Sequence, residues 1–188
     1  VDDHDDVYFA GVRGQVFLTE GHIDGHISFL FEDALFCGDT LFTGGCGYLF
    51  DGPPETMWHS LARLASLEPS TRVCCGHEYT QDNLRFAWFV EPGNSRLATR
   101  ISDVWALRSR GESAVPSTIE LEKETNPLVE TTHIKEMKAP QHVKTPRSRL
   151  APRDRPRPRR GDVHFNYVED GPLMFRDVFY DPLELPGV

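Results

Sequence analysis

Three short apolar segments of this chain each lead into a glycine and then a polar residue that is able to bind a metal ion. The polar residues are His22, Asp39 and His77, and the apolar segment before each one predicts a β-strand. Strand ends along one edge of a sheet converge in space, and catalytic groups gather there. The glycine allows the backbone to turn sharply at each end. The pattern therefore predicts a sheet with a polar site at one edge.

The hydrophobic pattern adds helices to these strands and predicts an α/β fold. A helix begins at residues 53–55, because proline suits a first helical turn and Glu55 complements the positive helix end. Apolar residues follow at helical spacing as far as Leu67, between two predicted strands, which gives a β-α-β order. The expected strands cover residues 15–19, 26–31, 34–37 and 71–75, and further helices cover residues 81–90 and 95–110. The last three strands are mostly apolar, which is typical of buried strands.

The basic residues are concentrated in one segment. Residues 131–161 hold ten Lys and Arg and two acidic residues, whereas the whole chain has a formal net charge of −9. Prolines are interleaved with the basic residues, so this segment is expected to be a disordered linker. Electrostatic binding of nucleic acid is a second reading, which we do not favour because such runs are usually solvated. Residues 162–188 contain aromatic residues without a periodicity that decides their structure.

Cysteine usage and hydropathy favour a cytoplasmic protein. The four cysteines are Cys37, Cys46, Cys74 and Cys75, and their spacing matches neither a disulfide framework nor a zinc ribbon. Reduced thiols are therefore expected. No apolar run approaches the roughly 18 residues of a membrane span, so no membrane association is expected. The acidic first residues do not resemble a signal peptide.

Two imidazoles and a carboxylate suit zinc, iron or manganese, because nitrogen and oxygen ligands bind all three metals. The carboxylate of Asp39 is also able to bridge two ions with its two oxygens. Each residue has a structural reading as well. A single loop histidine is more often structural, and an aspartate after a strand is a turn or helix cap about as often as a ligand. The residues alone leave both readings open.

Several longer segments resemble one known family. The segment 21–26 (GHIDGH) resembles the G-H-T-x-G-H segment of the metallo-β-lactamase superfamily. Within that superfamily, segments 36–52 and 75–92, which contain GCGYLF and GHEYT, resemble the hydroxyacylglutathione hydrolases, or glyoxalase II. Residues 115–118 and 126–127 match the helical domain of the same family. The resemblance covers residues 7–129.

The resemblance implies a role for each matching residue. His22 would ligate the first of two divalent ions, His77 the second, and Asp39 would bridge both, with zinc the expected metal and iron or manganese the alternatives. Tyr79 would contact the glutathione part of the substrate. Tyr48 and Phe50 would line the same pocket, although Tyr48 stands where relatives usually carry a basic residue, so weaker affinity for glutathione is expected. Loop packing is the alternative reading of Tyr48 and Phe50.

The family also uses a T-H-x-H-x-D-H loop that supplies further ligands to both ions, and the 188 residues contain no such loop. Residues 2–6 have the wrong spacing and receive no ligand role. Because zinc sites usually have four ligands, the three matching residues are expected to hold metal weakly on their own. One face of the sheet is expected to lack its cover, which favours aggregation or pairing with another chain. His26 is expected to support the site, and Cys37 and Cys46 to be packing residues.

Together, these observations predict part of a metallo-β-lactamase αββα sandwich followed by an α-helical C-terminal domain and a disordered basic tail. The expected division is residues 1–78, a partial helical domain at 79–130, a linker at 131–161 and a tail at 162–188. The implied reaction is hydrolysis of the thioester of an S-(2-hydroxyacyl)glutathione by metal-activated hydroxide, with this small molecule as the partner. The alternative is a non-catalytic remnant, or a fragment that binds a partner.

Overall fold

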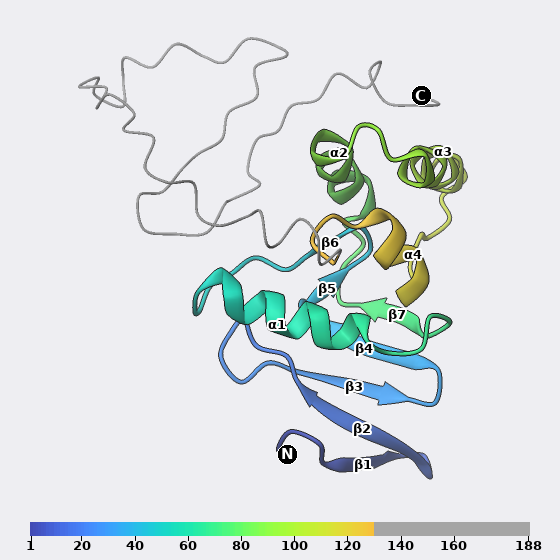
Figure 1. Cartoon of the computed structure of the whole chain (residues 1–188). Helices are drawn as coiled ribbons and strands as arrows, with labels where there is room; N and C mark the ends of the chain where they lie inside the picture. Colours follow the sequence, from blue (N-terminus) through green and yellow to red (C-terminus); the bar gives the residue numbers. More distant parts are fainter. Residues whose placement is uncertain (130–188) are drawn as a thin grey trace, which may run out of the picture.

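The computed structural model describes residues 1–129, and the expected linker at 131–161 and tail at 162–188 lie outside the described residues. A six-stranded mixed sheet with the strand order β1-β2-β3-β4-β7-β8 forms the centre of this part (Figure 1). Its strands are β1 (Asp6–Phe9), β2 (Val12–Leu18), β3 (Ile27–Phe31), β4 (Ala34–Gly38), β7 (Arg72–Cys75) and β8 (Ser117–Thr118). Strands β5 (Leu41–Phe42) and β6 (Gly45–Cys46) form a separate two-stranded ribbon.

Four helices accompany the sheet in the described residues. They are α1 (Pro54–Ala65), α2 (Thr80–Val90), α3 (Ser95–Ser109) and α4 (Ile119–Thr125). Helix α1 begins with Pro54 and carries Glu55 in its first turn, as the sequence predicts. Helix α3 is capped by Asn94, whose side chain accepts a hydrogen bond from the N–H of Leu97 at 3.1 Å. No helix in residues 1–129 is both long enough and apolar enough to cross a membrane.

The strands and helices that the hydrophobic pattern predicts are present within a few residues of the expected bounds. The pattern misses β1, β5, β6, β8 and α4. Three of these strands have only two residues and therefore carry no periodicity. Helix α4 has a mostly charged sequence and is recognisable chiefly by its cap, where Thr118 accepts from the N–H of Leu121 at 3.2 Å.

The strand directions bring the predicted polar positions to one edge of the sheet. Strands β2, β3 and β4 are successive antiparallel neighbours, so β2 and β4 run in the same direction. Strand β7 pairs with β4 in parallel, and α1 lies in the connection between them. This is the predicted β-α-β order. The carboxyl ends of β2, β4 and β7 consequently lie at the same edge.

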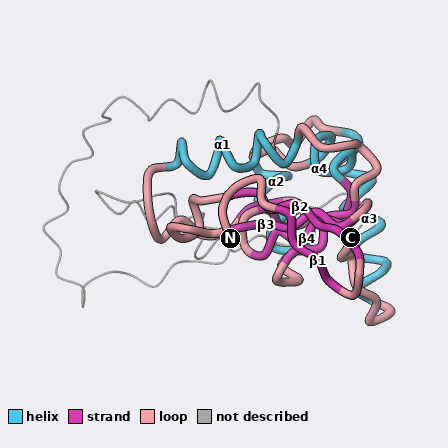
Figure 2. The backbone as a smooth tube through the Cα atoms, turned by 90° about the horizontal axis from the view of Figure 1, so that it is seen from below, coloured by secondary structure: helices cyan, strands magenta, loops and turns pink. Residues whose placement is uncertain are grey.

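One face of the sheet is packed against helices. Figure 2 shows α1 and α4 on the same side of the sheet. On that side, Leu35 of β4 and Val73 of β7 are fully buried together with Leu61 and Leu64 of α1. A second apolar cluster, which includes Leu84, joins α2 to α3 beyond the β7–β8 edge (Figure 1). The helical part thus has apolar contacts of its own.

The other face of the sheet is apolar but less covered. Phe36 of β4 is 48% exposed, and its neighbours Phe29 and Phe31 of β3 are only partly buried. Phe9 of β1 is 76% exposed. The expectation of buried strands therefore holds for one face only, because alternate residues of β4 point to opposite faces. A contiguous apolar surface of this kind favours association with another surface.

Leu35 and Phe36 are adjacent residues that test this difference between the faces. We expect Leu35→Ala to lower the free energy of unfolding by about 2–5 kcal/mol, because it leaves a cavity under α1. Phe36→Ala should lower the free energy of unfolding by less than about 1 kcal/mol, as expected for an exposed residue. It should also reduce self-association. Urea unfolding and sedimentation velocity measure the two effects. Equal losses of stability for the two variants would contradict the assignment of the faces.

Candidate metal centre

The structure brings the three predicted ligands together at the carboxyl ends of the strands. Nε2 of His22 lies 3.5 Å from Oδ2 of Asp39, and Nε2 of His77 lies 3.4 Å from the same oxygen. Both distances exceed those of a normal hydrogen bond. His22 and Asp39 are largely buried, whereas about half of the His77 side chain is exposed. One carboxylate oxygen therefore faces two imidazole nitrogens.

Within residues 1–129, no group of three or more His, Cys, Asp or Glu side chains is arranged to hold a metal ion. Instead, the imidazoles of His22 and His77 each make one contact with the Asp39 carboxylate. This arrangement suits two ions that each take one histidine and the common carboxylate, and it leaves each ion short of the four ligands usual for zinc. Nitrogen and carboxylate oxygen donors also suit iron and manganese.

The orientation of His22 is fixed by its other ring nitrogen. Nδ1 lies 2.7 Å from the carbonyl oxygen of Tyr48, which only accepts hydrogen bonds, so Nδ1 carries the proton and donates it. Nε2 of this tautomer then presents its lone pair to Asp39. Two lone pairs facing each other repel unless a cation lies between them. The contact from Nδ1 to a backbone carbonyl is also the usual support of a metal-binding histidine, so His22 fits the role of ligand.

The loop that carries His22 is held against α1. A Cβ added at Gly21 would lie 2.5 Å from Cα of Met57, so only glycine allows this close approach. The hydroxyl of Ser60 donates to the carbonyl oxygen of Glu20 at 2.6 Å. The N–H of Phe50 donates to the carbonyl oxygen of His22 at 3.0 Å. The backbone of His22 is thereby fixed from two directions.

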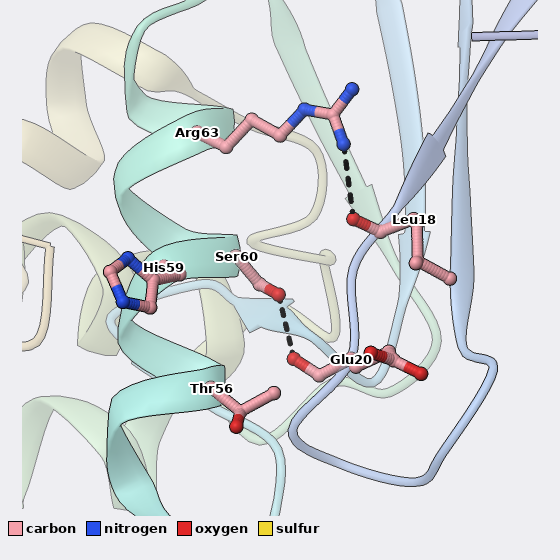
Figure 3. A pocket seen from close by; sticks show the side chains of 6 residues that line it. All are labelled: Leu18, Glu20, Thr56, His59, Ser60 and Arg63. Atoms are coloured by element: carbon pink, nitrogen blue, oxygen red, sulfur yellow. Dashed lines mark hydrogen bonds between the residues drawn. The ribbon is translucent and has the colours of Figure 1, made fainter. Parts of the chain in front are cut away.

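A shallow depression of about 260 Å³ lies at this contact between α1 and the end of β2 (Figure 3). It is lined by Leu18, Glu20, Thr56, His59, Ser60 and Arg63. Arg63 donates to the carbonyl oxygen of Leu18 and to the carboxylate of Asp3, and Ser60 donates to Glu20. The polar groups of Ser60 and Arg63 are thus used to join two elements, and none of the predicted site residues lines the depression.

Asp39 is positioned through the backbone and through His26. The N–H of Asp39 points to Nε2 of His26 at 3.4 Å, and Nδ1 of His26 lies 3.0 Å from the hydroxyl of Thr40. That hydroxyl donates its own proton to the carbonyl oxygen of Thr19, so it accepts from His26. Burial lowers the pKa of His26, and the neighbouring His22 lowers it further, while Asp39 opposes the shift. His26 therefore supports the site through these hydrogen bonds, as expected from the sequence, whereas the contribution of Thr19 and Thr40 was missed.

Two glycines allow the backbone to pass close to Asp39. A Cβ added at Gly47 would lie 1.7 Å from the carbonyl oxygen of Asp39 and 3.1 Å from Nδ1 of His22. A Cβ added at Gly76 would lie 2.6 Å from Oδ1 of Asp39. The backbone therefore passes directly beside the ligand set at both positions. The sequence offered a signal for Gly76, which precedes His77, but the need for glycine at position 47 is visible only in three dimensions.

Aromatic rings flank the two histidines. The ring of Tyr79 is stacked on that of His77, with centroids 5.0 Å apart and an angle of 14° between the planes. Phe50 makes an edge contact with His22 at 5.2 Å, and Tyr48 contacts Phe50 at 4.5 Å. Phe50 is 67% exposed and Tyr79 is 50% exposed. The structure thus places Tyr48 and Phe50 beside one imidazole and Tyr79 beside the other.

Glu78 connects the His77 segment to the helical part. Its carboxylate accepts hydrogen bonds from the hydroxyl of Ser113 at 2.7 Å and from the N–H of Ala114 at 2.9 Å. Burial acts to raise the pKa of Glu78, but the hydrogen bonds from Thr80, Ser113 and Ala114 outweigh it and hold this pKa below the ordinary value. Glu78 is therefore a structural carboxylate that points away from the metal ligands.

The cysteines take no part in the ligand set. All four cysteines of the chain are free. Cys37 is fully buried, its thiol donates to the carbonyl oxygen of Leu41 at 3.1 Å, and burial raises its pKa. Burial raises the pKa of the Cys46 thiol to about 12. Both behave as the packing residues that the sequence analysis expects, because neutral thiols are poor metal ligands.

Comparisons with known proteins show what this chain is similar to. Residues 3–77 match the family profile described as the metallo-beta-lactamase superfamily, and residues 78–151 match the profile described as the hydroxyacylglutathione hydrolase C-terminus. A hydroxyacylglutathione hydrolase from Pseudomonas fluorescens is 48% identical over 132 residues, which are 70% of this chain and 52% of that protein. A hydroxyacylglutathione hydrolase from Shewanella oneidensis is 51% identical over 115 residues, which are 61% of this chain and 43% of that protein. Among solved structures, ETHE1 from Myxococcus xanthus has 26% identity and a TM-score of 0.49, over 78% of this chain and 53% of that one.

A mixed sheet whose strand ends carry two histidines around one aspartate, together with the match over residues 3–77, makes this chain a member of the metallo-β-lactamase superfamily. The match over residues 78–151 and the identity of nearly half to curated relatives narrow the assignment. The chain belongs to the hydroxyacylglutathione hydrolase family, also called glyoxalase II. It spans about half the length of the curated relatives that it matches.

Gly47 and Gly93 form a matched pair for testing the packing around Asp39. We expect Gly47→Ala to lower the free energy of unfolding by about 1–3 kcal/mol, because its Cβ would overlap the Asp39 backbone. Gly93→Ala should change it by less than about 0.5 kcal/mol, since its Cβ would meet no atom within 4 Å. Chemical denaturation measures both. Full tolerance of alanine at position 47 would show that the loop does not approach Asp39 as described.

Proposed function

We propose that this chain carries part of the two-metal centre of a hydroxyacylglutathione hydrolase. The proposed reaction is hydrolysis of the thioester of an S-(2-hydroxyacyl)glutathione to glutathione and a 2-hydroxy acid. The observation that carries the proposal is the pair of imidazole Nε2 atoms that face one oxygen of Asp39, with Nδ1 of His22 engaged by a backbone carbonyl. The names of the curated relatives support the choice of substrate.

His22, Asp39 and His77 would hold the two divalent ions, with Asp39 as the common ligand. Such ions lower the pKa of a bound water to near neutrality and stabilise the oxyanion that forms at a carbonyl under attack. The residues of this chain supply the geometry for that chemistry. Hydrogen bonding by Tyr48 O and by His26 sets the direction in which His22 and Asp39 point. We propose zinc as the metal, with iron and manganese as the alternatives.

We further propose that the exposed aromatic rings bind the substrate. Tyr79 stacks on His77 and is half exposed, so its hydroxyl is available to hydrogen-bond the peptide part of glutathione. Tyr48 and Phe50 offer apolar surface on the His22 side. Neither of these two residues carries a positive charge, so the carboxylates of glutathione gain no ion pair from them. Weaker binding than in a site with a basic residue follows from this difference.

The proposal assigns residues 1–78 to the metal-binding unit and residues 79–130 to a partial helical unit. The two matching family profiles, which meet between residues 77 and 78, support this division. Each ion would have two ligands among His22, Asp39 and His77. Because zinc normally takes four ligands, the proposal requires further ligands from outside this set. The competing reading is a non-catalytic remnant or a fragment that binds a partner.

Metal content and turnover of the purified chain test the proposal. We expect the purified chain to bind added zinc, iron or manganese, but weakly, because each ion has only two ligands in the set. Binding and any hydrolysis of lactoylglutathione should be lost in His22→Ala and Asp39→Ala, because each change removes a ligand. His59→Ala is the control, since His59 is exposed on α1 and is none of the three ligands. Elemental analysis and release of free thiol are the measurements. A parent chain that binds added metal no more tightly than Asp39→Ala does would overturn the proposal and favour the remnant.

Tyr79→Phe tests the substrate contact separately from the metal. The loss of one hydroxyl should raise KM by roughly two- to tenfold, the effect of a typical hydrogen bond, while metal content and kcat change little. Tyr8→Phe provides the control, because Tyr8 is 70% exposed on β1. An unchanged KM in Tyr79→Phe would remove this residue from the proposed binding surface and leave the metal centre untouched.

A further inference from the structure

A buried ion pair lies between α3 and α4, outside the residues assigned to the metal centre. Arg100 is 4% exposed and Glu122 is 0% exposed, and the guanidinium donates to Oε1 of Glu122. The same guanidinium donates to the hydroxyl of Ser117 at 3.0 Å and to that of Thr125. All of these groups are buried. A charged pair in this position has lost its contact with water, so its remaining hydrogen bonds carry much of its energy.

The second oxygen of Glu122 reaches out of the helical part. Oε2 accepts the N–H of Gly44 at 2.8 Å, across 78 residues of sequence. Asn126, which is also buried, donates from Nδ2 to the carbonyl oxygen of Gly45 at 3.0 Å and to Oε2 of Glu122 at 3.1 Å. Gly44 lies at the turn between β5 and β6 and has a φ of +76°, a conformation that favours glycine. Glu122 and Asn126 therefore hold this turn by hydrogen bonds to its backbone.

The turn leads directly to the metal centre. Residues 41–46 form the β5–β6 ribbon, in which Leu41 pairs with Cys46. Gly47 follows at once, donates its N–H to the carbonyl oxygen of Thr40 at 3.3 Å, and lies against the Asp39 backbone. The next residue is Tyr48, whose carbonyl oxygen orients His22. The carbonyl of Gly45, which Asn126 binds, and the carbonyl of Tyr48, which holds the imidazole, are thus three residues apart.

Stability alone is a weak reason for such a pair. A buried ion pair is often replaceable by apolar side chains of similar volume without loss of stability, because burial of two charges is costly. The apolar clusters on both sides already join α3 and α4 to the rest of the fold. What apolar side chains cannot replace is a carboxylate oxygen in hydrogen-bond contact with the N–H of Gly44.

We propose that Glu122 is a positioning residue, held by Arg100 and assisted by Asn126, that fixes the β5–β6 ribbon and so sets the Tyr48 carbonyl that orients His22. The helical part then determines the tautomer and direction of a metal ligand without touching it. The inference rests on the proposed function only in that the oriented imidazole serves a metal. The contacts themselves do not depend on turnover.

The double variant Arg100→Met/Glu122→Met tests whether the ion pair positions the β5–β6 ribbon or only stabilises the fold. In the full chain, it should leave the urea midpoint near that of the parent, while amide hydrogen exchange of Gly44 and Gly47 becomes roughly tenfold faster or more, as the loss of a hydrogen bond to a charged group implies. Long-range ¹H–¹⁵N spectra should show that the Nδ1–H tautomer of His22 is no longer the single form. Both readouts are independent of hydrolysis, so they remain informative if no turnover is found.

A second variant covers the case in which the double variant does not fold. Asn126→Ser removes the amide that donates to Gly45 and leaves the ion pair intact, and a serine hydroxyl is still able to accept from the N–H of Leu128 as Asn126 does at 3.1 Å. It should shift the same two readouts in the same direction. Leu97→Ala is the control for general destabilisation, because Leu97 is buried in the apolar cluster of α2 and α3, which includes no residue of the ribbon.

Glu124→Gln is the control on the same helix, since within residues 1–129 the Glu124 carboxylate pairs with the exposed Arg96 and not with the ribbon. We expect unchanged exchange at Gly44 and an unchanged His22 tautomer in this variant. If a folded Arg100→Met/Glu122→Met or Asn126→Ser protein matches the parent in both readouts, or matches Leu97→Ala at equal stability, the pair is merely structural and the proposal is wrong.

Discussion

The parallel pairing of β4 with β7 is the constraint on which the rest of the site depends. It aligns the carboxyl ends of the two strands, so that Asp39 and His77 leave the sheet at neighbouring points. A parallel pair needs a long crossover, and the crossover here contains α1. The same helix contacts the loop that carries His22, through Met57 beside Gly21 and through the Ser60 hydroxyl, which donates to the carbonyl oxygen of Glu20. One connection therefore serves both the sheet and the third proposed ligand.

Much of this arrangement is predictable from the sequence because its signals are local. Hydrophobic periodicity, helix caps and the Gly and Pro residues at element ends predict strands β2, β3, β4 and β7 and the first three helices. The three proposed ligands are recognisable because a glycine precedes each one at a predicted strand end. The short ribbon of β5 and β6 lacks such a signal, since two-residue strands have no period and their position is set by partners elsewhere.

What the sequence could not supply is the set of contacts between distant segments. Gly44 and Glu122 are 78 positions apart, and nothing near Glu122 marks it as different from the other acidic residues of α4. The clash that makes Gly47 necessary involves the backbone of Asp39, which periodicity does not describe. The exposed face of the sheet was predicted only through the family resemblance. The apolar residues of β3 and β4 by themselves favoured strands that are buried on both faces.

The ion pairs of this protein differ in what they are able to contribute. The pairs Arg72–Asp33 and Arg96–Glu124 are exposed, so water and salt compete with them and each contributes little to stability. The Arg100–Glu122 pair is buried, and its energy depends on every neighbouring donor being in place. A displacement of the β5–β6 ribbon would remove the hydrogen bond from the Gly44 N–H to Oε2 of Glu122 in a dry environment. The cost of that loss restrains the ribbon, and through Tyr48 it also restrains the imidazole of His22.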